Sequence, residues 1–213
     1  SCMINPLSGK EGIWNIEPAQ EKKKIGIVGA GPAGLQAAWI LGKRGHQVTV
    51  YEKNETAGGQ YRLACVPTMK QDLAKTISTY LAFCQKYNVD IHYQINVTKE
   101  LLEQQDFDEI IIATGSTPVI PSIEGIHSDH VYLAQDILSF SHILPQGHIL
   151  VLGAGLVGAE TSELLAEYGH QVTMVDMLDH VAPLAPKRPR ENLLQHLKEL
   201  NVQIQLQSQV MKI

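Results

Sequence analysis

The sequence contains few cysteines, and no two of them stand at a redox-active spacing. Cys2, Cys65 and Cys84 are widely separated among the 213 residues. The absence of a CxxC or CxxxxC pair argues against a dithiol that cycles as a catalytic disulfide. A low cysteine count is also typical of proteins from a reducing compartment, so we expect a cytoplasmic protein.

The sequence also lacks a surplus of basic residues and a long apolar run. Lysine and arginine number 17 against 22 acidic residues, and this net charge of −5 argues against a nucleic-acid partner. No apolar stretch approaches the roughly 20 residues that span a bilayer, so we expect no membrane segment. The first residues, SCMINPLSGKEG, show no basic-then-apolar export signal. The 44% of apolar residues is enough to build the core of an α/β protein.

The chain contains the same glycine-rich pattern twice. Residues 28–53 read VGAGPAGLQAAWILGKRGHQVTVYEK, and residues 152–177 read LGAGLVGAETSELLAEYGHQVTMVDM. The two copies are 124 residues apart, share the pentapeptide GHQVT, and place an acid, Glu52 or Asp176, eighteen residues after the third glycine. Two GxGxxG patterns in one register, each between an apolar strand and a helical pattern, predict two dinucleotide sites.

Each residue type in the pattern has a physical reason. The first glycine permits a tight turn, the second lets a pyrophosphate approach the backbone, and the third allows close packing of the helix on the strand. The helix N-terminus attracts the phosphates, and the acid accepts hydrogen bonds from a ribose diol. The alternative is a glycine-rich turn without a ligand. The candidate ligand residues are Gly29, Ala30, Gly31, Pro32, Ala33, Gly34, Glu52 and Lys53, and in the second copy Gly153, Gly155, Leu156, Val157, Gly158 and Asp176.

Hydrophobic periodicity predicts alternating strands and helices on either side of a boundary near residue 118, where prolines break the chain. The predicted strands are 24–28, 47–51, 89–93, 108–113, 148–152, 171–175, 202–206 and 209–213. The predicted helices are 32–44, 69–86, 134–140, 156–168 and 191–200. We therefore predict an α/β fold with an N-terminal extension (1–23), a Rossmann-like FAD- or ADP-binding domain (24–118) and a Rossmann-like NAD(P)H-binding domain (119–213).

Further motifs carry a family resemblance. ATGSTP at 113–118 looks like the second flavin motif of flavoproteins with two dinucleotide-binding domains, arranged as in the disulfide reductases. GGQ at 58–60 and the opening SCMINP strengthen the match. The chain resembles the C-terminal half of the NADH:flavin oxidoreductases related to 2,4-dienoyl-CoA reductase and trimethylamine dehydrogenase. In that family an FMN-containing barrel and cysteines for a 4Fe–4S cluster come before the FAD and NAD(P)H domains.

The resemblance implies roles for residues outside the glycine patterns. Cys2, in a C-x-x-N-P context, would be the final ligand of the 4Fe–4S cluster, which needs further thiolates from elsewhere. The partner would be the rest of the same polypeptide, and the second domain is expected to be truncated at its C-terminus. Lys70 would contact the FAD by this resemblance, but it could equally be a lysine on the surface of a helix. The residues that the resemblance adds along the FAD are Gly59, Gln60, Lys70, Val97, Thr114 and Gly115.

The implied function is an electron relay in which NAD(P)H reduces FAD, and electrons then pass through the cluster to FMN for reduction of an activated C=C bond. No catalytic side chain is expected in this chain. Asp176 is followed by Met-Leu-Asp without a nearby arginine or lysine, which favours NADH over NADPH. Two alternatives stay open: a module like the small subunit of glutamate synthase, and a non-catalytic domain that binds ADP as a structural ligand. The sequence predicts neither the substrate nor the oligomeric state.

Overall fold

The chain folds into two compact units. A computed structural model describes residues 5, 7–142, 144 and 146–213. The first unit comprises the described residues up to Cys65 together with Lys70–Thr117, and the second comprises Val66–Met69 and Pro118–Ile213. The main division thus lies between Thr117 and Pro118, within the proline-bearing segment that follows the ATGSTP motif.

A parallel four-stranded sheet forms the first unit, with the strand order β3-β2-β1-β4. The chain moves outward from β1 to β3 and then returns to place β4 on the other side of β1. This reversal creates a switch point at the carboxyl ends of β1 and β4, where open α/β sheets bind their ligands. The strands are β1 (Lys24–Val28), β2 (Gln47–Tyr51), β3 (Asp90–His92) and β4 (Glu109–Ile112).

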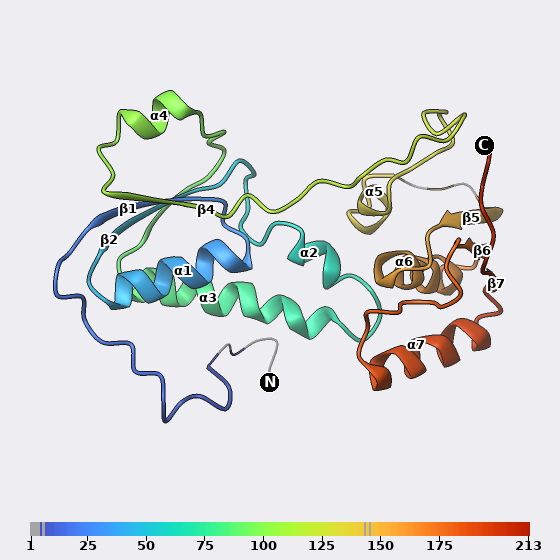
Figure 1. The fold of residues 1–213 in the computed structure, drawn as a ribbon, viewed down its shortest axis with the longest axis horizontal. Helices are drawn as coiled ribbons and strands as arrows, with labels where there is room; N and C mark the ends of the chain where they lie inside the picture. The colour runs from blue at the N-terminus through green and yellow to red at the C-terminus, as the bar shows by residue number, and fades with distance from the viewer. Residues whose placement is uncertain (1–4, 6, 143, 145) are drawn as a thin grey trace. The chain divides into compact units, whose positions relative to one another are not determined.

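Two helices cover one face of this sheet, as Figure 1 shows. They are α1 (Pro32–Lys43) and α3 (Lys75–Lys86), which also pack against each other. Fully buried side chains, including Ile27 and Leu35, fill the space between the helices and the strands. Shorter helices occupy the connections: α2 (Tyr61–Ala64), the 3₁₀ helix η1 (Gln71–Ala74) and α4 (Lys99–Glu103).

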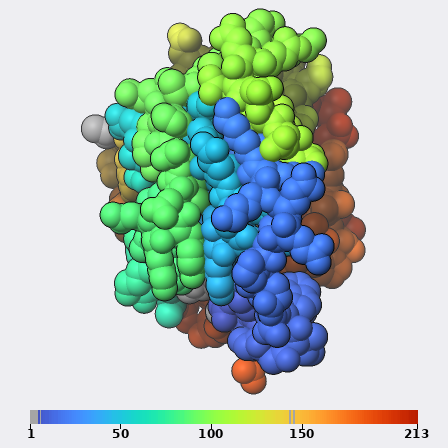
Figure 2. Space-filling model, turned by 90° about the vertical axis from the view of Figure 1, so that its left-hand side faces the viewer, coloured from blue at the N-terminus to red at the C-terminus, as the bar shows by residue number. Residues whose placement is uncertain are grey.

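The segment before β1 contains neither a helix nor a strand among its described residues. It runs over the surface of the first unit (Figure 2). The Ala19 N–H donates to the Arg44 carbonyl at 2.9 Å, and the Lys10 ammonium lies 4.0 Å from the centroid of the Trp14 ring. The hydrogen bond attaches the segment to the C-cap of α1, and the Lys10–Trp14 contact lies within the segment itself.

The second unit repeats the first three strands as a parallel sheet with the order β5-β6-β7. Met174 and Leu197 are fully buried in its core, between the sheet and the helices. The strands are β5 (His148–Leu152), β6 (Gln171–Val175) and β7 (Gln203–Gln205), and the helices are α5 (Ala134–Leu138), α6 (Leu156–Glu167) and α7 (Lys187–Glu199). None of the helices that the structure describes is long and apolar enough to cross a membrane.

Three predicted elements differ from the structure. The segment 209–213 is not a strand, because only Lys212 forms a bridge, with Glu124. The helix predicted over 69–86 begins at Lys75, since Met69 has a left-handed φ of 64° that an α-helix cannot include. The last helix begins earlier than predicted, at Lys187, because a proline is tolerated in the first turn, where its missing N–H has no partner to lose.

A carboxylate–imidazole contact links α6 to α7. His196 Nδ1 lies 2.6 Å from Glu163 Oε1, and its Nε2 lies 3.9 Å from Glu167 Oε1. The hydrogen bond with Glu163 raises the pKa of His196 above its ordinary value of 6.5, although partial burial opposes this shift. Burial raises the pKa of Glu163, and the hydrogen bond to His196 opposes it. Both shifts favour the protonated forms in the folded chain.

This contact predicts a pH dependence of stability. Because the folded-state pKa of His196 is raised, its contribution is fully present below 6.5 and is lost as the pH rises through the folded-state pKa. The free energy of unfolding, measured in urea, should therefore fall as the pH rises above about 6.5. His196→Gln should flatten this change, whereas His127→Gln, at an exposed histidine, should leave it intact. Equal slopes for wild type and His196→Gln would contradict the assignment.

Candidate dinucleotide sites

In the first glycine loop, two of the three glycines leave no room for a side chain, and one does leave room. Gly29 has a φ of 104°, and a Cβ there would lie 2.4 Å from the Ala113 carbonyl oxygen. A Cβ at Gly34 would lie 1.9 Å from the carbonyl oxygen of Gly29. A Cβ at Gly31 would meet no atom within 4 Å. The first and third glycines are therefore required by the fold, and the second leaves space in front of the backbone at the N-cap of α1.

The acid at the end of β2 is held by the same loop. Glu52 is 4% exposed, and its Oε2 accepts the Ala30 N–H at 2.9 Å. Its Oε1 accepts from the backbone and side-chain nitrogens of Asn54 at 2.9 and 2.8 Å. The carboxylate thus fixes the strand end against the glycine loop. Since a carboxylate offers about four acceptor positions, it retains capacity for a hydroxyl group.

The second glycine loop repeats the close third glycine and the open second glycine, whereas a Cβ at Gly153, which has a φ of 104°, would meet no atom within 4 Å. A Cβ at Gly158 would lie 1.9 Å from the Gly153 carbonyl oxygen, and a Cβ at Gly155 would meet nothing within 4 Å. Asp176 accepts the Ala154 N–H through Oδ2 at 2.5 Å and the Leu178 N–H through Oδ1 at 2.8 Å. The predicted residues Leu156 and Val157 lie in the first turn of α6 and are exposed, at 42% and 60%.

The loops that close the two sites are matched in position but not in residue type. The Gly58 N–H donates to the Ala30 carbonyl at 2.8 Å, and 124 residues later the Ala182 N–H donates to the Ala154 carbonyl at 2.7 Å. Gly58 has a φ of 116°, and Ala182, although it carries a Cβ, has a φ of 44°. Ala182 is not among the residues predicted from the sequence. It stands 124 residues after Gly58 of the GGQ motif, and this offset, which also relates the two glycine motifs, could have identified it.

The predicted flavin-side residues gather at the carboxyl ends of β1 and β4. A Cβ at Gly59 would lie 3.6 Å from Gly31 Cα, which places the GGQ loop beside the open glycine. Gln60 Nε2 donates to the Ser116 carbonyl, so this loop is joined to the segment that contains Thr114 and Gly115. In the glycine motif itself, Pro32 and Ala33 form the first turn of α1.

Other predicted ligand residues lie apart from these contacts. Lys53 is exposed and follows Glu52, and Lys70 is the N-cap residue of η1. Val97 precedes Thr98, the N-cap of α4. The glycine-loop contacts given above involve none of the three.

Cys2, predicted as a cluster ligand, lies outside the described residues. Among the residues that are described, no group of three or more His, Cys, Asp or Glu side chains could hold a metal ion.

The two described cysteines are not arranged for thiol chemistry. Cys65 and Cys84 are both buried and free. Burial raises the pKa of Cys65, with an opposing effect from the charge of Lys70, and burial raises that of Cys84 to about 11. Both thiols are therefore protonated at neutral pH, whereas a nucleophilic cysteine needs a lowered pKa.

Two parallel sheets with a glycine loop and an acid at each switch region define an α/β protein of the Rossmann-like, dinucleotide-binding class. The family model for pyridine nucleotide-disulphide oxidoreductase matches residues 23–213. The chain therefore belongs to the pyridine nucleotide-disulphide oxidoreductase family. This match confirms the predicted fold class, with two Rossmann-like domains for FAD and NAD(P).

The chain is similar to part of several longer proteins, among them three reductases. Bilirubin reductase of Mediterraneibacter gnavus is 37% identical over 204 residues, which cover 96% of this chain and 32% of the relative. Cinnamate reductase of Clostridium sporogenes is 36% identical over 85% of this chain and 27% of its own length. A solved 2-naphthoyl-CoA reductase complex matches with a TM-score of 0.92 and 30% identity over 100% of this chain and 32% of its own. The chain spans about a third of these proteins, and the recognition of a reductase-related module is confirmed.

The glycine geometry predicts different outcomes for two similar substitutions. Gly34→Ala should destabilise the first unit by about 2 kcal/mol or more, because its Cβ would overlap a backbone oxygen that cannot move freely. Gly31→Ala should leave the melting temperature unchanged, because the position is open and its φ of −72° suits alanine. Thermal unfolding of both variants by circular dichroism tests this. Equal melting temperatures would show that Gly34 is not required for packing.

Proposed function

We propose that this chain is the FAD- and NADH-binding module of a multidomain flavoenzyme that reduces an activated carbon–carbon double bond. The FMN and the 4Fe–4S cluster of such an enzyme would belong mainly to the rest of the polypeptide. The observation that carries the proposal is the duplicated site, with an open glycine at Gly31 and at Gly155. The names of the relatives, reductases of bilirubin, cinnamate and 2-naphthoyl-CoA, support the substrate class.

The residues of the first site fit an adenine dinucleotide. The N–H groups at the start of α1 have no preceding helical turn, and Gly31 leaves the space that a pyrophosphate needs. Glu52 would bind the adenosine ribose while it retains its contact with Ala30. Gln60 and Gly115 would line the path toward the flavin. The chemistry supplied by a bound flavin is the exchange between two-electron hydride transfer and one-electron transfer.

In the second site the acids favour NADH. Asp176 would bind the ribose diol, and a 2′-phosphate placed there would meet its negative charge. Four residues later His180 could offer a cation, but its Nδ1 lies 2.5 Å from Asp179 Oδ1. The hydrogen bond with His180 lowers the pKa of Asp179, so this carboxylate is ionised at neutral pH and offsets any positive charge on the imidazole. The turn therefore presents net negative charge to a 2′-phosphate.

Calorimetric titration with FAD and, separately, with ADP tests the first site. We expect FAD to bind more tightly than ADP, because Gln60 and the segment after β4 would contact the flavin half. Gly31→Ala should weaken both ligands by roughly ten-fold or more, since a Cβ would occupy the space of the pyrophosphate. Gly12→Ala, at an equally open glycine outside the motif, is the matched control. Equal affinities for FAD and ADP would support the ADP-binding alternative instead.

The cofactor preference of the second site is tested with NADH and NADPH. Wild type should bind NADH more tightly than NADPH, and Asp176→Asn should reduce this preference by roughly ten-fold. Asp179→Asn should improve NADPH binding, because it removes an ionised carboxylate from the turn. Asp129→Asn, at an exposed acid outside the site, serves as the control for net charge. An unchanged NADH to NADPH ratio in Asp176→Asn would remove the basis for the NADH assignment.

A further inference from the structure

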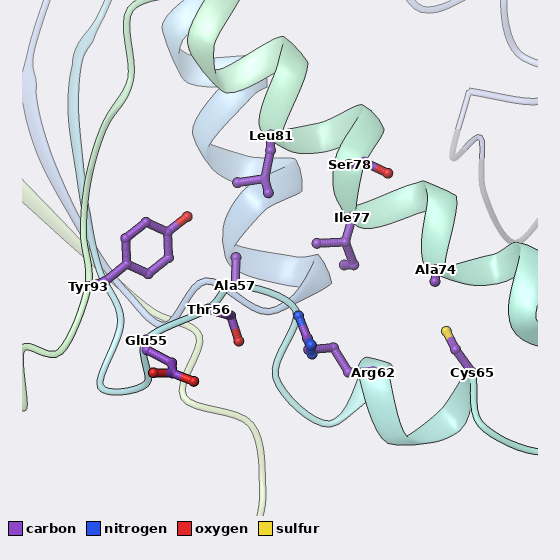
Figure 3. Close-up of a pocket in the computed structure, with 10 residues that line it drawn as sticks. All are labelled: Glu55, Thr56, Ala57, Arg62, Cys65, Ala74, Ile77, Ser78, Leu81 and Tyr93. Carbon is purple, nitrogen blue, oxygen red and sulfur yellow. The ribbon is translucent and has the colours of Figure 1, made fainter. Parts of the chain in front are cut away.

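A concave site lies in the first unit, between the loop that follows β2 and α3. It is a pocket of about 590 Å³, a size that is typical of small-molecule sites. Figure 3 shows its walls: the loop after β2, the short helix α2, the side of α3 and Tyr93 after β3. Its lining includes the buried residues Ala57, Cys65 and Ile77, and includes no residue of either glycine motif. The pocket therefore combines an apolar base with lining residues that lie outside both glycine motifs.

Two opposite charges at this pocket lack protein partners. Within the described part of the chain, neither the Glu55 carboxylate nor the Arg62 guanidinium makes a hydrogen bond or an ion pair, including with each other. In Figure 3 the two side chains lie on either side of Thr56. Both residues are exposed, so each charge is available to a ligand from solvent without a protein contact being broken.

The backbone fixes the base of the Arg62 side chain. The Arg62 N–H donates to the Gly59 carbonyl at 3.2 Å, at the start of α2. A Cβ at Gly58 would lie 2.8 Å from Arg62 Cγ, so the arginine stem packs on a position that only glycine leaves free. On the opposite wall, Ile77 and Leu81 come from α3, one helical turn apart. The charge and the apolar wall are thus held by separate elements of the same unit.

We propose that this pocket binds a zwitterion with an apolar side chain, the chemistry of a hydrophobic α-amino acid. The carboxylate of the ligand would pair with the Arg62 guanidinium, which can donate two parallel hydrogen bonds to a planar carboxylate. The ammonium group would face Glu55, and the side chain would cover Ala57, Ile77 and Leu81. A simple carboxylate would leave Glu55 unpaired beside its own charge, and a simple amine would do the same to Arg62. A ligand with both charges would pair with both residues at once.

The probe for this site is L-phenylalanine, titrated calorimetrically into the 213-residue chain without nucleotide. We expect binding at least five-fold tighter than that of 3-phenylpropionate, which lacks the ammonium group, or of phenethylamine, which lacks the carboxylate. Arg62→Gln and Glu55→Gln should each weaken phenylalanine binding by at least five-fold. Lys43→Gln and Glu11→Gln remove one exposed charge of each sign outside the pocket lining and should change nothing.

Several outcomes would overturn the assignment. These are no detectable binding at about 10 mM phenylalanine, equal binding of the three compounds, and equal losses in the control variants. A titration with ADP separates this pocket from the dinucleotide site, because Arg62→Gln should keep wild-type ADP affinity. Parallel losses of ADP and phenylalanine would assign Arg62 to the nucleotide instead. Failure of wild type to bind ADP would count against the proposed function alone, since the phenylalanine titration contains no nucleotide.

Discussion

Both halves of the chain depend on the close approach of a helix to the loop that precedes it. In each unit the third glycine brings the helix backbone against the carbonyl of the first glycine, at a distance that leaves no room for a Cβ. This packing places the free N–H groups of the helix N-terminus beside the carboxyl ends of the strands. The second glycine can then remain open, because the first and third already fix the loop.

The acid that follows the second strand of each unit stabilises the glycine loop, in addition to its predicted role in binding a ligand. Glu52 and Asp176 each accept the N–H that lies between the first two glycines of their loop. A neutral side chain at either position would leave that N–H without its charged acceptor, and this loss would weaken the glycine loop itself. Binding and folding are therefore coupled at these acids, and glutamine or asparagine substitutions separate the two effects better than alanine.

The two units share their glycine loops and acids, whereas the segments after them differ. In the first unit, α2 and η1 separate the GGQ loop from α3, and the pocket with Glu55 and Arg62 forms there. In the second unit the corresponding loop leads into α7 without such helices, and Ala182 takes the place of a glycine. The two glycine loops are therefore alike, but different segments surround them. These segments are where the ligand preferences of the two sites can differ.

The sequence by itself determined the two glycine loops, their acids and the alternation of strands and helices, because backbone sterics and periodicity act over short distances. It could not determine that 209–213 forms no strand, since parallel pairing depends on a distant neighbour. Ala182 was missed because an alanine stands where the first copy has Gly58, although its N–H makes the corresponding hydrogen bond, to Ala154. Only the tertiary structure brought Gln60 to Ser116 and Glu55 and Arg62 to one pocket. Such contacts arise from loop paths, which no local pattern encodes.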